Sequence, residues 1–223
     1  LLANDWRVEE ECVAALEALL PMVDLDAVSC ADLVQILNGL TKARFDDEML
    51  FRRLGTHPRL PKLLRSCSGQ ELSTTIYSYA RMYVLSAPFF AALRKELERR
   101  VVKGQKEGQS GFRRMNDQEV ANIAWSLTVI PFQALERDSD TAVAGDGFWD
   151  HVRLLALEEA GQRSSLLPSH KRQLFQVFSS LYPRLTDAAQ RKLPLGVDLD
   201  EEAFQEPSAC WVDCELVPEA MKR

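Results

Sequence analysis

One apolar pattern recurs four times along the 223-residue chain and constrains its fold more than any other feature. In each copy, apolar side chains stand at relative positions 0, 3, 4 and 7, the spacing that gathers them on one face of an α-helix. The copies are Leu33, Ile36, Leu37, Leu40; Leu72, Thr75 (a polar exception), Ile76, Tyr79; Val120, Ile123, Ala124, Leu127; and Leu174, Val177, Phe178, Leu181. No segment shows the alternation with period two that is typical of strands, so we predict an all-α chain.

The starts of these helices share a second pattern. A serine or asparagine precedes each of the first three copies, and an acidic residue follows three positions later, as in a capping box. The pairs are Ser29 with Asp32, Ser68 with Glu71, and Asn116 with Glu119. The fourth copy has His170 and Gln173 at those places, although Pro168 and Ser169 still suit a helix start. Three such pairs in one register indicate a structural repeat.

A second amphipathic stretch follows each of the first three copies, at about 47–54, 87–102 and 148–159, and an earlier helix is expected at about 5–20. Each unit is therefore a helix, a turn and a helix. The copies start 39, 48 and 54 residues apart, and the extra length falls in polar connections at 103–114 and 133–147.

Stacked units of this kind bury the apolar faces that a single unit leaves exposed. We therefore predict an α-solenoid of about four degenerate helical-hairpin repeats over residues 29–193. Residues 1–28 are expected to form an N-terminal helix or capping half-repeat. Residues 194–223, which are acidic and contain two prolines, are expected to form an extended tail.

The segment Asn116–Leu127, which reads NDQEVANIAWSL, resembles the first helix of organellar repeat proteins related to FAST-kinase and RAP-domain proteins. That group includes octotricopeptide and heptatricopeptide repeats. The segments Ser68–Ala80 and Ala31–Ala43 are similar to the same element. The resemblance implies an α-solenoid in mitochondria or plastids. It also implies binding or processing of organellar RNA, or a place in an organellar ribosome.

Basic residues concentrate in the middle of the chain. Residues 33–197 hold 24 Lys and Arg against 17 Asp and Glu, whereas 1–32 and 198–219 hold eight acids each and a single base between them. Two basic stretches are candidate RNA-binding segments, because phosphates attract such clusters and arginine stacks on unpaired bases. Their residues are Arg52, Arg53, Arg59, Lys62 and Arg65 in the first, and Arg94, Lys95, Arg99, Arg100, Lys103, Lys106, Arg113 and Arg114 in the second. The alternative is a solvated helix face, which the i, i+4 pair of Glu96 and Arg100 favours.

Aromatic residues offer a second candidate RNA contact, as a stacking platform for bases. Tyr79 occupies a core position of the repeat and Trp125 flanks one, so packing is the better interpretation of both. Tyr77 and Tyr83 are less constrained by the pattern and are expected to be more exposed.

No chemistry-bearing motif indicates an enzyme, a metal or a cofactor. The three histidines are widely spaced, and neither a nucleophile elbow nor a phosphate-binding glycine loop is present. The five cysteines are odd in number, and three lie in apolar helical patterns where a free thiol acts as a small hydrophobe. This predicts free cysteines in a reducing compartment. Cys210 and Cys214 stand four residues apart, without a second pair to complete a zinc site.

These features lead us to expect a non-enzymatic helical-repeat protein of the mitochondrial matrix, with plastid or cytosol as alternatives. The most specific expectation is a mitochondrial ribosome component that contacts rRNA and neighbouring proteins. We expect neither a small-molecule substrate nor membrane insertion, since no apolar run approaches the ~20 residues needed to span a bilayer. The alternative is a protein-only scaffold or accessory subunit of another mitochondrial complex, which the net charge of −6 and the irregular repeats favour.

Overall fold

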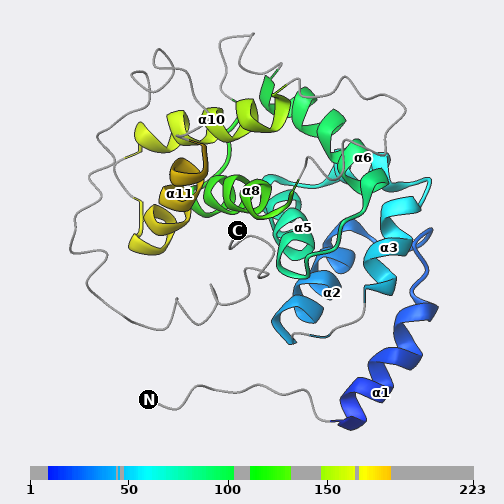
Figure 1. The fold of residues 1–223 in the computed structure, drawn as a ribbon. Coiled ribbons are helices and arrows are strands. Elements are labelled where there is room, and N and C mark those ends of the chain that lie inside the picture. The colour runs from blue at the N-terminus through cyan, green and yellow to red at the C-terminus, as the bar shows by residue number, and fades with distance from the viewer. Residues whose placement is uncertain are drawn as a thin grey trace, which may run out of the picture.

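The structure is a computed structural model that describes residues 10–43, 45, 48–102, 111–131, 147–163 and 166–181; for 10–13 and 102 it describes the backbone alone. These residues fold into helices joined by turns, and no strand occurs among them (Figure 1). The prediction of an all-α chain is confirmed over this part. Most of the two polar connections and the whole acidic tail lie outside the described residues.

Helices follow one another along the chain with bounds close to those predicted. They are α1 (Glu10–Leu19), the 3₁₀ turn η1 (Leu20–Met22), α2 (Cys30–Ala43), α3 (Met49–Thr56), α4 (Leu60–Ser66), α5 (Gly69–Arg81), α6 (Ala87–Leu97), the π-helical turn η2 (Glu98–Val102), α8 (Asp117–Val129), α10 (Phe148–Gly161) and α11 (Pro168–Leu181). The four copies of the pattern lie in α2, α5, α8 and α11.

Two rows of helices result from the way these elements pack (Figure 1). In the first row, α2 packs on α5, α5 on α8, and α8 on α11. In the second row, α3 and α4 both pack on α6, and the guanidinium of Arg94 in α6 lies 4.7 Å from the ring centre of Phe148 in α10. We call α2, α5, α8 and α11 the first row, and α3, α4, α6 and α10 the second row.

The apolar pattern forms the core of the first row, as predicted. Leu37, Leu72 and Ile123 are among its fully buried members, while Ile36 and Phe178 are partly buried and pack against the core. The polar exception, Thr75, is also buried. Its hydroxyl donates a hydrogen bond to the carbonyl of Glu71 at 2.8 Å, which removes the cost of burying an unpaired polar group.

One tyrosine ties the two rows together. Tyr79 of α5 is fully buried, and its hydroxyl donates to the carbonyl of Phe51 in α3 at 2.7 Å. Its ring stacks on Phe89 of α6 with 3.6 Å between centroids and meets Phe51 edge-on. Burial raises the pKa of the Tyr79 phenol well above its ordinary value, so the group remains a neutral donor. The assignment of Tyr79 to the core is confirmed.

The capping boxes begin the first-row helices as the sequence indicates. Ser68 and Asn116 each accept from the backbone N–H three residues later, and the Glu71 and Glu119 carboxylates accept from the backbone N–H groups of the two caps. At α2, Ser29 accepts from the Asp32 N–H at 3.1 Å. The aspartate side chain is shorter than that of glutamate, and its carboxylate accepts from the Ser29 hydroxyl instead of from the Ser29 backbone N–H. The first box is therefore a variant.

The start of α11 departs from the aligned register. The helix begins at Pro168, and the position that aligns with the caps, His170, is buried within its first turn. Its Nε2 lies 2.8 Å from the Gln118 side-chain oxygen in α8, while the Gln173 amide donates to Asn122 at 3.3 Å. These side chains join α11 to α8 across the row instead of capping a helix.

The second row is less regular than predicted. A separate helix, α4, follows α3 after a break at Pro58. Pro61 lies in the first turn of α4, a position that suits proline. The single stretch expected at 87–102 changes from α6 to the π-helical η2 at Glu98. The helical apolar spacing survives this change, because Phe89, Leu97 and Val101 are all buried.

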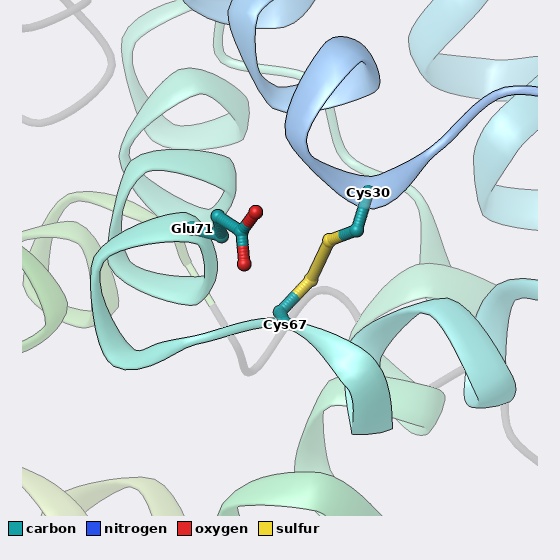
Figure 2. A group of neighbouring side chains, drawn as sticks. All are labelled: Cys30, Cys67 and Glu71. Carbon is teal, nitrogen blue, oxygen red and sulfur yellow. A yellow bond between two sulfur atoms is a disulfide. The ribbon is translucent and has the colours of Figure 1, made fainter.

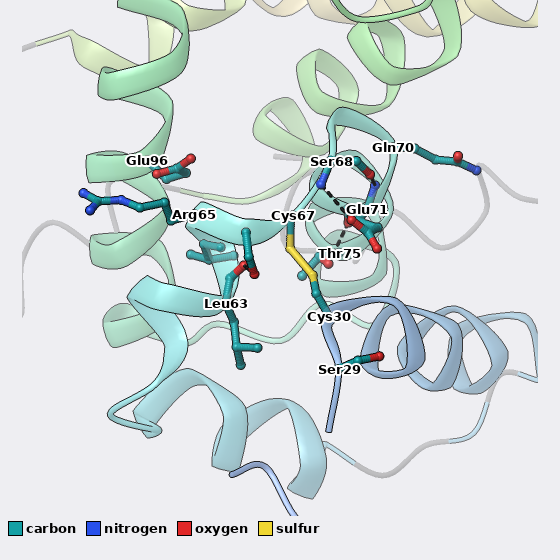
Figure 3. Close-up of a disulfide and its surroundings, with 12 residues drawn as sticks. Ser29, Cys30, Leu63, Arg65, Cys67, Ser68, Gln70, Glu71, Thr75 and Glu96 are labelled. Carbon is teal, nitrogen blue, oxygen red and sulfur yellow. Dashed lines mark hydrogen bonds between the residues drawn. A yellow bond between two sulfur atoms is a disulfide. The ribbon is translucent and has the colours of Figure 1, made fainter. Parts of the chain in front are cut away.

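Two cysteines correct the expectation of free thiols. Cys30, the first residue of α2, and Cys67, which follows α4, form a disulfide with their Cα atoms 6.1 Å apart (Figures 2 and 3). Helical periodicity did not indicate this pairing, because the two positions are separated by 37 residues and meet only when the first row is assembled. Cys210 and Cys214 lie outside the described residues.

Candidate nucleic-acid interface

The predicted RNA-binding cations divide into those that hold the fold together and those that face outward. Lys103 and Lys106 lie outside the described residues. The other eleven fall on α3, α4, α6, η2 and the turns beside them, all in or next to the second row. Their hydrogen bonds separate the two kinds, and sequence alone did not.

Arg53 and Arg59 are structural residues. Arg53 in α3 donates to the carbonyls of Leu20 and Val23, at 2.9 Å each. Arg59 donates to the carbonyl of Leu25 at 2.8 Å and to that of Asp26. The Leu20 carbonyl belongs to the first residue of η1, and the others lie in the turn that leads into α2. A guanidinium that donates to several carbonyls can bind phosphate only by releasing them, so both of these predicted RNA contacts are engaged in bonds within the fold.

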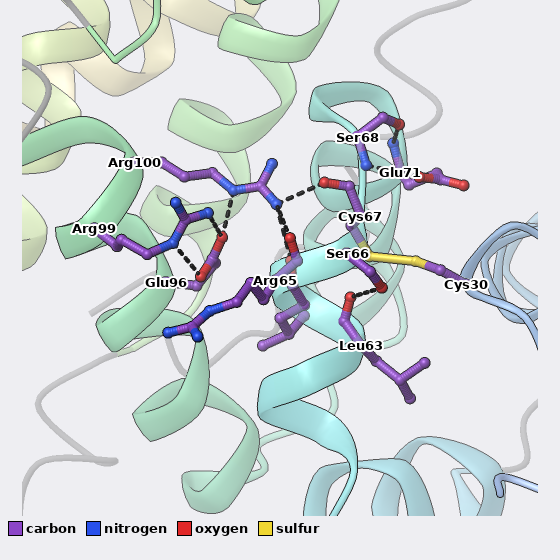
Figure 4. Close-up of polar contacts among 11 residues, drawn as sticks. Cys30, Leu63, Arg65, Ser66, Cys67, Ser68, Glu71, Glu96, Arg99 and Arg100 are labelled. Carbon is purple, nitrogen blue, oxygen red and sulfur yellow. Dashed lines mark hydrogen bonds and ion pairs between the residues drawn. A yellow bond between two sulfur atoms is a disulfide. The ribbon is translucent and has the colours of Figure 1, made fainter.

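Arg100 has the same role one unit later (Figure 4). It donates to the carbonyls of Leu64 at 2.9 Å, Arg65 at 3.2 Å and Cys67 at 2.6 Å, at the end of α4. Its Nε also donates to the Glu96 carboxylate. Arg100 is therefore also engaged in bonds within the fold.

A fourth arginine, which the sequence interpretation missed, completes the series. Arg163, just after α10, donates to the carbonyl of Phe112 at 2.9 Å and pairs with Asp117 at 2.8 Å. In all three units, a second-row arginine therefore bonds the turn that precedes the first-row helix of the same unit. The sequence separation is 33 residues for Arg53 to Leu20, Arg59 to Asp26 and Arg100 to Cys67, and 51 for Arg163 to Phe112. The recurrence of an arginine at the 33-residue offset was a signal that the sequence offered for the first two units, whereas Arg163 lies at a different offset.

Glu96 is the acidic partner of two arginines in the second basic stretch. Its side chain is buried and accepts from Arg99 at 2.6 and 3.0 Å as well as from Arg100 (Figure 4). Burial raises the pKa of this carboxyl, but hydrogen bonds and charge from Arg99 and Arg100 outweigh it and hold the pKa below its usual value. The hydrogen bond to Glu96 in turn raises the pKa of Arg99. The solvated-face interpretation is thus correct for part of this stretch and wrong for Arg100, which is mostly buried.

Four outward cations remain on adjacent helices. Lys62 and Arg65 stand one turn apart on α4, and Lys95 and Arg99 stand one turn apart on α6 and η2; all four are exposed. The helices α4 and α6 pack on each other, and Figure 4 places Arg65 beside Glu96 and Arg99. We call Lys62, Arg65, Lys95 and Arg99 the α4–α6 basic surface.

The other predicted cations lie apart from this surface. Arg52 is exposed on α3 and pairs with Glu48. Arg94 is half-buried over Phe148. Arg113 and Arg114 are exposed in the turn before α8.

The aromatic residues form a contact on the first row. The rings of Tyr77 in α5 and Trp125 in α8 lie 5.4 Å apart, and the Trp125 indole N–H donates to Gln176 in α11 at 2.7 Å. Both rings are half-buried. Packing of Trp125 is confirmed, whereas Tyr77 is less exposed than expected because it packs on that indole. Tyr83 is half-buried and ends α5 with a φ of 52°, a conformation that glycine usually supplies.

One cluster has the composition of a metal site. The Cys30 and Cys67 sulfurs and a Glu71 carboxylate oxygen all lie within 4.8 Å of one another (Figure 2). Two of its donors are joined as a disulfide, and Glu71 is bonded to the N–H of Ser68 at 2.7 Å. In this state the cluster offers no thiolate to a metal.

Comparisons with known proteins identify no family. No family model matches the chain, and no solved structure matches it. A segment of 70 residues is 37% identical to a chaperone protein HscA homolog of Pseudomonas aeruginosa (strain LESB58). The match covers 31% of this chain and 11% of that protein, so it is a local similarity. Among the described helices, none combines the length and apolar character needed to cross a membrane.

Proposed function

We propose that this chain is a non-enzymatic helical-repeat protein of an organellar ribonucleoprotein assembly, most specifically a mitochondrial ribosome component. The fold we propose is an α-solenoid, supported by the serial packing of α2, α5, α8 and α11. The mitochondrial assignment rests on the similarity of the first-row helices to FAST-kinase-related and RAP-related repeats.

The observation that carries the RNA role is the α4–α6 basic surface. Its cations come from two packed helices and are exposed, while the arginines that hold the fold are turned toward carbonyls. Exposed lysine and arginine on a rigid surface bind the phosphate backbone by releasing its counterions, without reading sequence. Such binding suits a protein shaped to fit a folded RNA in a larger assembly.

The experiment compares two double variants of the full chain that lose the same net charge. Lys62→Gln/Arg65→Gln removes two cations from the α4–α6 basic surface, and Lys42→Gln/Lys171→Gln removes two from the first-row helices α2 and α11. Binding to an organellar rRNA fragment is measured from low to high salt. We expect the first variant alone to flatten the plot of log K against log salt, by about 0.7 to 0.9 for each phosphate that the chain no longer neutralises.

Equal flattening by the two variants would show that net charge, and not this surface, governs binding. A wild-type chain that binds no RNA at low salt would overturn the RNA role.

A protein-only scaffold is the second candidate, and one observation favours it. Leu19, Met22 and Met49 are exposed by 59%, 75% and 43% at the N-terminal end, where η1 contacts both α1 and α3. Exposed apolar side chains gathered at one end are typical of protein contacts. Crosslinking in the native assembly distinguishes the candidates, because the scaffold predicts crosslinks to proteins alone and the ribonucleoprotein role predicts RNA crosslinks at Lys62 or Arg65.

A further inference from the structure

The Cys30–Cys67 disulfide joins the starts of two first-row helices. Cys30 is the first residue of α2, beside its cap Ser29, and Cys67 immediately precedes Ser68, the cap of α5 (Figure 3). The 37-residue separation encloses α3 and α4. The bond therefore closes the first unit into a covalent ring and fixes the distance between neighbouring first-row helices at one end.

The two sulfurs differ in how a reagent reaches them. Cys67 is buried, with 6% of its surface exposed, whereas Cys30 is only partly buried. An incoming thiolate thus meets Cys30 first, and Cys67 is the sulfur that departs. Disulfides that a protein thiol reaches are the ones that exchange, because exchange begins by direct attack on a sulfur atom.

Two nearby charges act on the reduced state in opposite directions. A thiolate on Cys30 lies at the positive end of the 14-residue helix α2, which attracts its negative charge. The Glu71 carboxylate, within 4.8 Å of both sulfurs, acts in the opposite direction. That carboxylate is held by the N–H of Ser68, so it can coordinate a metal only by giving up the capping box of α5. The site is therefore built for thiol chemistry more than for a cation.

We propose that Cys30 and Cys67 are a reversible thiol–disulfide site that takes a protein dithiol as its reductant and stiffens the first unit when oxidised. One thiolate of the dithiol attacks the Cys30 sulfur, the Cys30–Cys67 bond breaks, and Cys67 leaves as a thiolate that takes up a proton. The second thiol of the reductant then attacks the mixed disulfide and releases Cys30. Two electrons pass to this chain, and the reductant ends as a disulfide.

The disulfide also lies next to Arg100, which bonds η2 to the end of α4. The carbonyl of Cys67 accepts from Arg100 at 2.6 Å, and Arg100 also bonds Glu96, which accepts from Arg99 of the α4–α6 basic surface. Reduction breaks the covalent bond at the turn around Cys67, which then keeps its hydrogen bond from Arg100. The inference does not depend on the proposed RNA role, because it concerns the bond and its exchange.

The first experiment uses the full chain with Cys12, Cys210 and Cys214 changed to serine, so that only this pair can react. We expect glutathione redox buffers to convert two thiols into one Cys30–Cys67 crosslinked peptide, seen by mass spectrometry after alkylation, and a protein dithiol to reverse it without denaturant. The melting temperature of the oxidised chain should exceed that of the reduced chain by about 5–10 °C. Cys30→Ser should abolish this difference.

A matched variant tests the environment of the thiols. Glu71→Gln keeps a side chain that can serve the capping box but removes the charge, so reduced Cys30 should react with iodoacetamide several-fold faster at pH 7. An unchanged rate would contradict the electrostatic account of the site.

Three results would overturn the proposal. The crosslinked peptide does not form in oxidising buffer; the bond forms but resists the dithiol until the chain unfolds; or the reduced chain binds one Zn²⁺ that blocks oxidation, with binding lost in Cys30→Ser and Glu71→Gln. The last would assign a metal site in place of a redox site. Because the first two measurements use the wild-type pair and need no Cys30 variant, a Cys30→Ser chain that failed to fold would not rescue the proposal.

Discussion

The two rows of helices are stabilised in different ways. First-row helices begin at local signals, since Ser68 and Asn116 bond acidic partners three residues away, and they bury a periodic apolar face. The second row is held by long-range bonds, in which Arg53, Arg100 and Arg163 reach carbonyls 30 or more residues away in the chain. The basic stretches of this chain therefore contain both structural and exposed arginines, which only the fold separates.

The largest effect is expected where the rows meet. Tyr79→Ala removes a fully buried ring that stacks on Phe89, and we expect a loss of about 4 kcal/mol of unfolding free energy in urea titrations. Tyr79→Phe keeps the ring and loses the bond to the Phe51 carbonyl, so the unfolding free energy should fall by about 1 kcal/mol. Equal losses for the two variants would show that the hydrogen bond, and not the ring, joins the rows.

The second-largest effect is expected at η2, where substitution of two neighbouring arginines should lower the unfolding free energy by different amounts. Arg100→Gln leaves three α4 carbonyls without their donor and should cost about 2–3 kcal/mol, whereas the more exposed Arg99→Gln should cost under about 1 kcal/mol. Chemical denaturation of the two variants is the measurement. A larger loss for Arg99→Gln would reverse the structural and exposed assignments.

Acid should weaken the second row through Glu96. The folded state lowers the pKa of this carboxyl, so its stabilising contribution is present above its ordinary pKa of 4.5 and is lost as pH falls through the lowered value. The unfolding free energies of wild type and Glu96→Gln should therefore differ by a constant amount above about pH 5 and converge below it. A difference that instead grew in acid would contradict the sign of the shift. We expect a smaller effect than for Arg100→Gln, because protonated Glu96 still accepts hydrogen bonds.

The smallest effects are expected at the first-row caps. Ser68→Ala breaks a complete capping box and should cost about 1 kcal/mol, while Ser29→Ala, in the variant box of α2, should cost about 0.5 kcal/mol. Thermal unfolding of the oxidised chain measures both. The account fails here if Ser29→Ala is the more costly, because the reciprocal bond from Glu71 would then add nothing.

The first row was predictable because its signals are local. Periodicity gave the buried faces of α2, α5, α8 and α11, and the caps placed three of the four starts. The start of α11 at Pro168 agrees with the helix start that Pro168 and Ser169 indicated. What the sequence did not indicate is that His170 bonds Gln118 in a neighbouring helix, an interaction that sequence spacing does not encode. The Cys30–Cys67 bond was missed for the same reason, since it forms between first-row helices after they pack.

Prediction of the candidate interface was poorer, because basic residues were counted without their partners. Lys62 and Arg65 are exposed as expected, but Arg53, Arg59 and Arg100 bond carbonyls inside the fold. An arginine and a lysine have the same charge, but the arginine guanidinium holds five N–H donors in a fixed plane, which suits it to bonding several carbonyls at once.

Urea unfolding of two matched double variants tests the division between structural and exposed cations most directly. Arg53→Gln/Arg59→Gln removes the donors to the turn before α2, and Lys62→Gln/Arg65→Gln removes the same charge from the exposed face of α4. The account predicts a loss of about 3 kcal/mol or more for the first variant and a change within about 0.5 kcal/mol for the second. Equal losses, or a larger loss for Lys62→Gln/Arg65→Gln, would contradict it.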